Sequence, residues 1–129
     1  MLLADVVATS AAIAATRSRK AKVAAIADLL ARAGADELDT VTAYVGGALR
    51  QRRTGLGWRG LVGLPPPAGT PTLTVLEVHE AFDRIAALAG AGSQSARGAA
   101  VEQLFGRATG EEQQWLRGVV TGEVRQGAL

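Results

Sequence analysis

The chain has 129 residues, of which 48% are hydrophobic, 20% charged and 4% aromatic, which fits one globular domain or one piece of a larger protein and excludes a disordered chain. It contains no cysteine, which excludes disulfides and thiolate metal sites and fits a reducing cytoplasm. The net charge of +2 does not by itself indicate a nucleic-acid partner.

The first half of the chain is predicted to form three helices. Residues 1–15 resemble a signal peptide, but Asp5 comes early and no basic residue precedes the apolar run, so we expect a helix over residues 3–16. Ser18 is expected to cap a second helix that ends at Ala33, with Gly34 as its stop signal. The inner side of that helix is predicted to carry Ala21, Ala24, Ala25, Leu29 and Leu30. A third helix is expected to start at Asp36, with Val41, Tyr44, Val45 and Leu49 at helical spacing.

The second half begins with a Pro- and Gly-rich linker, residues 52–73, in which 58–64 are expected to form a short helix. The sequence TVLE at 74–77 is typical of a capping box and predicts a fourth helix through Ala89. Ser93 is expected to open a fifth helix through Arg107, and Thr109 to cap a sixth that runs to about Thr121. No segment alternates like a strand, and no apolar run is long enough to span a bilayer. The prediction is therefore one all-α domain of about six helices with no membrane partner.

The positive charge is concentrated in two stretches, 17–22 and 50–59, which contain no acidic residue. Such segments are typical of a polyanion-binding surface, although a single cluster more often only solubilises a helix end. Eight of the fourteen cations fall in them: Arg17, Arg19, Lys20, Lys22, Arg50, Arg52, Arg53 and Arg59.

The chain also repeats itself. A shift of 75 residues aligns 18–51 with 93–126 without a gap, and 12 of the 34 positions are identical. The Ala matches partly reflect composition, but matched Ser, Arg, Glu, Gly and Gln residues do not. We expect two helical hairpins, each starting at a serine and ending in Gly-x-x-Arg-Gln, that pack as a pseudo-twofold pair or stack as a solenoid.

A pseudo-twofold pair with basic, Gly-rich ends suits duplex DNA, whose antiparallel backbones are themselves related by twofold axes. Helix N-termini at Ser18 and Ser93 would offer backbone N–H groups to phosphates, and Arg50 and Arg125 would add cationic donors. Close approach of the backbone would be allowed at Gly47, Gly90, Gly92 and Gly122. Each feature taken singly is more often a simple helix cap; their repetition as a set favours a ligand-facing edge.

Residues 90–129, GAGSQSARGAAVEQLFGRATGEEQQWLRGVVTGEVRQGAL, resemble the Gly-x-Gly-Ser segment and helical hairpin of the N-terminal DNA-binding domain of ATP-dependent DNA ligases. Gly122–Gly127 reproduce the family's Gly-x-Leu-Arg-x-Gly phrase with Val for Leu, and TGLGWRGLVGL is similar to its Leu-Gly turn. The chain departs from the family in having Arg97 and Gly98 where a lysine is usual, and Trp58 where a small or aliphatic residue is usual.

The resemblance implies a helical domain that grips the minor groove of nicked double-stranded DNA without reading its sequence, with contacts to phosphates and sugars. It also implies that the intact protein is a DNA ligase that acts in repair and replication, located in the cytoplasm with the nucleoid. The contact candidates are Gly90, Gly92, Ser93, Gln94, Arg97, Gly122, Arg125 and Gly127, with Ser18, Lys20, Lys22, Gly47, Arg50 and Arg53 as their counterparts in the first repeat.

No catalytic residue or metal site is predicted in this chain. Neither lysine, Lys20 or Lys22, lies in the Lys-x-Asp-Gly motif that carries AMP in these ligases, and the single histidine, His79, is expected to be structural. The resemblance assigns ATP and Mg²⁺ to the intact enzyme and makes the remaining catalytic domains partners of this one. The alternative is a helical module that binds a partner helix, which high salt would not weaken as it weakens phosphate contacts.

Overall fold

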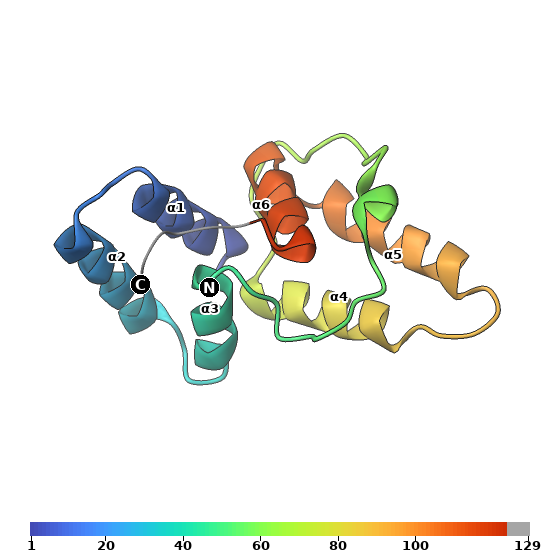
Figure 1. Ribbon diagram of the computed structural model, residues 1–129, viewed down its shortest axis with the longest axis horizontal. Coiled ribbons are helices and arrows are strands. Elements are labelled where there is room, and N and C mark those ends of the chain that lie inside the picture. The colour runs from blue at the N-terminus through green and yellow to red at the C-terminus, as the bar shows by residue number, and fades with distance from the viewer. Residues whose placement is uncertain (124–129) are drawn as a thin grey trace.

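The computed structural model describes residues 1–123 and confirms the all-α class (Figure 1). Within this range the chain forms six α-helices, one 3-10 helix and no strand. The α-helices are α1 (Leu3–Ala14), α2 (Arg19–Arg32), α3 (Leu38–Val45), α4 (Val75–Ala87), α5 (Ser93–Gly106) and α6 (Gly110–Thr121), and the 3-10 helix is η1 (Trp58–Leu61). No helix of the described residues is long and apolar enough to cross a membrane.

The helix ends agree with the predicted ends to within two residues, except around α3 and η1. The helix α3 begins at Leu38 and not at Asp36, and its C-terminal cap is Gly46, so Leu49 lies beyond it. Gly47 follows with φ +85°, a left-handed conformation that ends the helix and that a side chain would strain. The predicted short helix at 58–64 is a single 3-10 turn that stops at Leu61, because Val62 is already extended.

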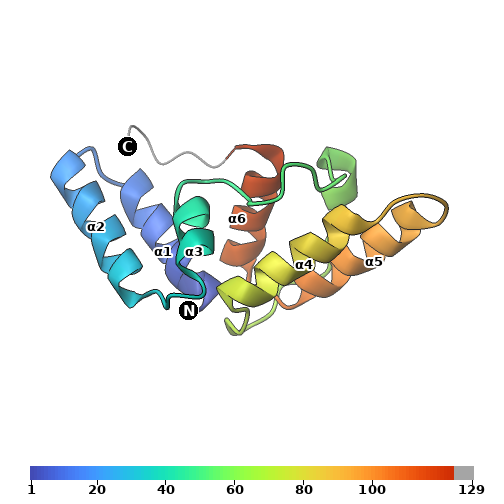
Figure 2. The same cartoon turned by 90° about the horizontal axis from the view of Figure 1, so that it is seen from below.

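The helices form an elongated molecule with α2 at one end and the connection between α4 and α5 at the other (Figures 1 and 2). The helix α1 packs against α2, α3 and α6, and α4 packs against α3 and α5. The N-terminal residues join the start of α1 to the start of α4, because Leu3 donates its N–H to the Leu73 carbonyl (2.9 Å) and Val75 donates to the Met1 carbonyl (2.9 Å). The core that results is aliphatic, with Tyr44, Phe82 and Phe105 as its largest fully buried side chains.

The inner face of α2 is narrower than predicted. Leu29 is its one fully buried residue, Ala25 and Leu30 are partly buried, and Ala21 and Ala24 are exposed. The prediction for Ala21 and Ala24 was wrong because α2 lies at the end of the molecule and packs on neighbours from one side only. Its N-terminal, basic half is therefore left facing solvent.

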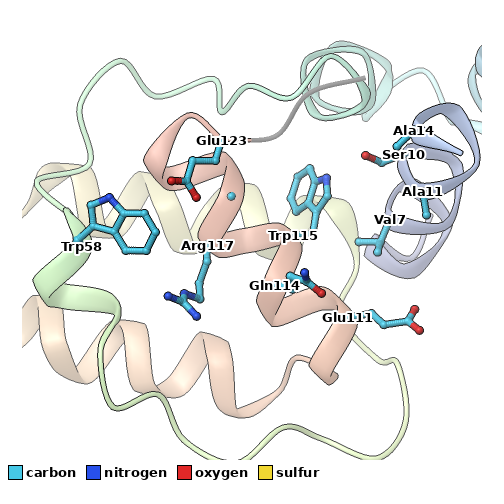
Figure 3. A pocket seen from close by; sticks show the side chains of 11 residues that line it. Val7, Ser10, Ala11, Ala14, Trp58, Glu111, Gln114, Trp115, Arg117 and Glu123 are labelled. Carbon is cyan, nitrogen blue, oxygen red and sulfur yellow. The ribbon is translucent and has the colours of Figure 1, made fainter. Parts of the chain in front are cut away.

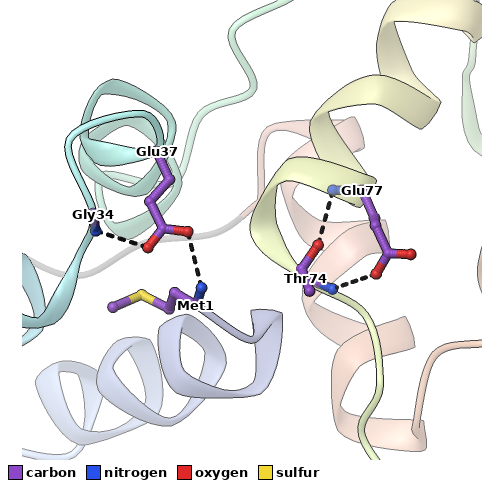
Figure 4. A network of polar contacts seen from close by, with 5 residues as sticks. All are labelled: Met1, Gly34, Glu37, Thr74 and Glu77. Carbon is purple, nitrogen blue, oxygen red and sulfur yellow. Dashed lines mark hydrogen bonds and ion pairs between the residues drawn. The ribbon is translucent and has the colours of Figure 1, made fainter.

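Three glutamate side chains stabilise the backbone at the starts of α3, α4 and α6. Two of them complete capping boxes, Thr74 with Glu77 and Thr109 with Glu112, as the sequence TVLE predicted for the first (Figure 4). Glu37 accepts from the Gly34 N–H and from the N-terminal ammonium, both at 2.9 Å (Figure 4). The Gly34 bond, followed by the ammonium, lowers the pKa of Glu37, and bonds from Arg107 and Thr74 lower the pKa of Glu77.

Candidate nucleic-acid interface

The first basic stretch surrounds the start of α2. Ser18 is the N-cap, as predicted, and its Oγ accepts from the Ala21 N–H at 3.1 Å. The first turn of α2 contains no acidic residue, so the positive end of the helix dipole adds to the side-chain charges. Ser18 and Lys20 are exposed and Lys22 is half-buried, and neither lysine forms an ion pair with a carboxylate of residues 1–123.

The second basic stretch follows the end of α3. Arg50 is exposed and donates from Nη1 to the Thr40 hydroxyl at 3.3 Å, which holds its guanidinium near α3. Arg53 is exposed, and no carboxylate of the described residues pairs with either arginine. The arginines that do pair with carboxylates in that range are Arg32 and Arg107, which lie outside both stretches. The two basic stretches therefore keep their charge free for a ligand.

Gln51 has a structural role that the sequence did not reveal. Its Nε2 donates to Asp83 Oδ1 at 2.7 Å and to the His79 carbonyl at 3.3 Å, which fastens the chain after α3 to the side of α4. The same amide nitrogen lies 3.2 Å from His79 Nδ1, and His79 Nε2 lies 3.4 Å from Asp83 Oδ2. His79 is thus a half-buried structural residue, as predicted. The two residues of the repeated Arg-Gln motif therefore differ in role: Arg50 is an exposed cation, and Gln51 connects the chain to α4 through hydrogen bonds.

The Gly-x-Gly-Ser segment forms an open turn between α4 and α5. Gly90 and Gly92 have φ +83° and +80°, and a Cβ built on either would meet no atom within 4 Å, so backbone geometry and not crowding requires glycine. Gly92 is the N-cap of α5, and Ser93 is its first helical residue and makes no capping bond. Ser93 therefore opens α5, as predicted, but it does not cap that helix with its side chain as Ser18 caps α2. The N–H groups of Gln94 and Ser95 find no acceptor within residues 1–123, which leaves two donors at this helix start.

Arg97 is held by the protein. Its Nη2 donates to the Leu88 carbonyl at 2.9 Å, and a Cβ on Gly55 would lie 2.8 Å from its Cζ, so Gly55 is needed for the linker to pass over the guanidinium. Arg97 therefore joins α4, α5 and the linker, and a role for it at DNA stays a prediction. Gly122 caps α6 with φ +76°, while the predicted contacts Arg125 and Gly127 lie outside the described residues.

The predicted contact segments lie mainly on one side of the molecule. Figure 2 shows the N-terminal end of α2, the C-terminal ends of α3 and α6, and η1 toward its upper side, with the α4–α5 turn projecting at the far end. The structure thus brings the ends of α3 and α6 together near the middle, and places α2, which Ser18 caps, and the α4–α5 turn at opposite ends. At the middle, the Tyr44 ring of α3 packs on the Trp115 ring of α6 with centroids 5.4 Å apart.

This surface offers cations, backbone donors and open turns, which suit an extended polyanion. Among the described residues no three His, Asp or Glu side chains are grouped to hold a metal ion.

Comparisons with known proteins agree with that chemistry. The family described as DNA ligase N terminus matches residues 64–129. A probable DNA ligase of Nocardioides sp. is 84% identical over 134 residues and one of Kineococcus radiotolerans is 66% identical over 134 residues, each matched along 100% of this chain. A third, from Beutenbergia cavernae, is 63% identical over 129 residues. The chain spans about a quarter of the length of these relatives, 26%, 26% and 25% respectively.

Proposed function

Because this chain belongs to the family of DNA ligase N-terminal domains, we propose that it is the DNA-binding domain of an ATP-dependent DNA ligase. In this role it grips nicked duplex DNA across the minor groove and leaves the chemistry to the rest of the protein. We assign ATP and Mg²⁺ to that remainder, because neither Lys20 nor Lys22 lies in a Lys-x-Asp-Gly motif. The other domains of the same ligase are then its protein partners. The domain would act at the nucleoid in the cytoplasm, in DNA repair and replication.

The observation that carries the proposal is the unpaired charge of the two basic stretches, on the side where helix ends converge. Phosphate contacts need exposed cations and free N–H donors and no base-reading side chains, which matches Lys20, Arg53 and the start of α5. A nick has no preferred sequence, so such contacts suffice. We further propose that the α2–α3 and α5–α6 hairpins act as equivalent grips on opposite strands. The left-handed glycines Gly47 and Gly122 at corresponding ends support this.

Binding to random-sequence duplexes with and without a nick, measured over a salt series, tests the proposal. We expect a dissociation constant on the order of 10⁻⁴–10⁻⁶ M near physiological salt, a steep loss of affinity as salt rises, and no effect of scrambling the duplex. A strong preference for one sequence, or affinity that does not change with salt, would contradict it.

A second function, binding of a partner helix, is favoured by one feature. An open groove of about 700 Å³ runs between α1 and α6, with Val7, Ala11 and Trp115 among its lining residues (Figure 3). Apolar binding of this kind would persist at high salt, so the same salt series distinguishes the two functions.

A further inference from the structure

Trp58 differs from every other aromatic residue of the chain in its exposure. Tyr44, Phe82, Phe105 and Trp115 are buried, at 0–6% exposure, whereas Trp58 in η1 is 53% exposed. Exposure of a large indole to water is costly unless another molecule covers the ring. Trp58 lies beside Arg59 in the stretch 50–59, which contains no acidic residue.

The position of this indole is fixed by α6. The Arg117 guanidinium lies over the Trp58 ring, 5.6 Å from its centroid, and Arg117 is itself exposed and pairs with no carboxylate of residues 1–123 (Figure 3). A cation over an aromatic face is a favourable contact that orients the ring. The 3-10 helix η1, which carries Trp58, lies on the side of the molecule where α3 and α6 end (Figure 2). Trp58 therefore has a positive charge beside it on that side.

The surroundings decide which part of DNA the indole suits. Glu111 and Glu123 line the same groove as Trp58 and Arg117, so a phosphate would be repelled from its floor. In an intact duplex the faces of the bases are covered by stacking, and the apolar atoms open to a protein in the minor groove belong mostly to the deoxyriboses.

From this arrangement we propose that Trp58 is a DNA contact that lays its exposed face on deoxyribose in the minor groove. This inference rests on the proposed function and deepens it: Trp58 supplies an apolar part of the affinity, while the basic stretches supply the electrostatic part. Because no phosphate is neutralised, the contact releases no counterions and its contribution does not depend on salt.

The test compares Trp58→Ala, Trp58→Phe and Val62→Ala in the 129-residue chain, with nicked random duplex over a salt series. Val62 is the matched control, since it is 75% exposed, apolar and only four residues away. We expect Trp58→Ala to weaken binding about tenfold at every salt concentration with the salt slope unchanged, Trp58→Phe to keep most of the affinity, and Val62→Ala to bind as the unmodified chain does. Melting temperature measured for each variant separates lost contact from lost folding.

Tryptophan fluorescence gives an independent reading. DNA should quench the emission of the unmodified chain and leave Trp58→Phe, which retains only the buried Trp115, unquenched. If DNA binds with the expected salt dependence while Trp58→Ala binds equally well and no quenching occurs, the inference about Trp58 fails and the proposed function stands. If the unmodified chain binds no DNA, the proposed function fails and this inference falls with it.

Discussion

Replacing Gln51 with alanine should loosen the segment that follows α3 without removing any charge. The change deletes the Nε2 hydrogen bonds to Asp83 Oδ1 (2.7 Å) and to the His79 carbonyl (3.3 Å), and removes the amide that lies 3.2 Å from His79 Nδ1. The Asp83 side chain is 60% exposed, so water recovers much of the charge-assisted part. We therefore estimate a loss of about 1–2 kcal/mol in the free energy of unfolding, or roughly 4–8 °C in melting temperature for a domain of this size.

Thermal melting with hydrogen exchange provides the assay, and Arg52→Ala is the control because it alters the next residue, which is exposed. Gln51→Ala should melt lower and exchange faster between residues 46 and 57, while Arg52→Ala should do neither. If both variants melt like the unmodified chain, the tether to α4 contributes nothing and the division of roles between Arg50 and Gln51 is wrong.

Three further variants test the local structure. Gly92→Ala places a side chain at φ +80° and should lower the free energy of unfolding by about 1–2 kcal/mol. Gly98→Ala lies in open space inside α5, the helix that Gly92 caps, and should raise the melting temperature. Equal effects of the two variants would refute the conformational argument. Glu37→Gln should lower the melting temperature at pH 7, because the folded-state pKa of Glu37 is below its ordinary 4.5 and the carboxylate stabilises the fold above that pH. As the pH falls below about 4.5, Glu37 takes up a proton in the unfolded chain before it does so in the folded chain, so the difference should shrink until the pH has passed the lower folded-state pKa; a difference constant from pH 7 to pH 3 would contradict this.

Local signals in the sequence predicted most of the helices. The capping box at 74–77 and the Thr109 cap are short-range patterns that determine a helix start almost alone, and both starts were confirmed. The end of α3 was missed because Leu49 continues the helical spacing while Gly46 and Gly47 end the helix.

The candidate site was predictable in its charges but not in its tertiary partners. Contacts between residues far apart in the sequence, such as Gln51 with Asp83, 32 residues apart, and Arg97 with Gly55, cannot be read from local patterns. Gln51 and Arg97, two polar residues of the motifs, therefore proved to be structural. The exposure of Trp58 likewise depends on where η1 lies against α6, which no local pattern encodes.

The salt dependence of DNA binding for single charge variants tests the central claim most directly. Lys20→Gln and Arg53→Gln remove one unpaired cation from each basic stretch, and Arg32→Gln removes a cation that already pairs with Asp5 and Asp28. If the stretches grip phosphates, each of the first two variants should reduce the slope of log K against log salt by about 0.9, and Arg32→Gln should leave it unchanged. Equal slopes for all three variants and the unmodified chain would show that these cations do not contact the DNA backbone.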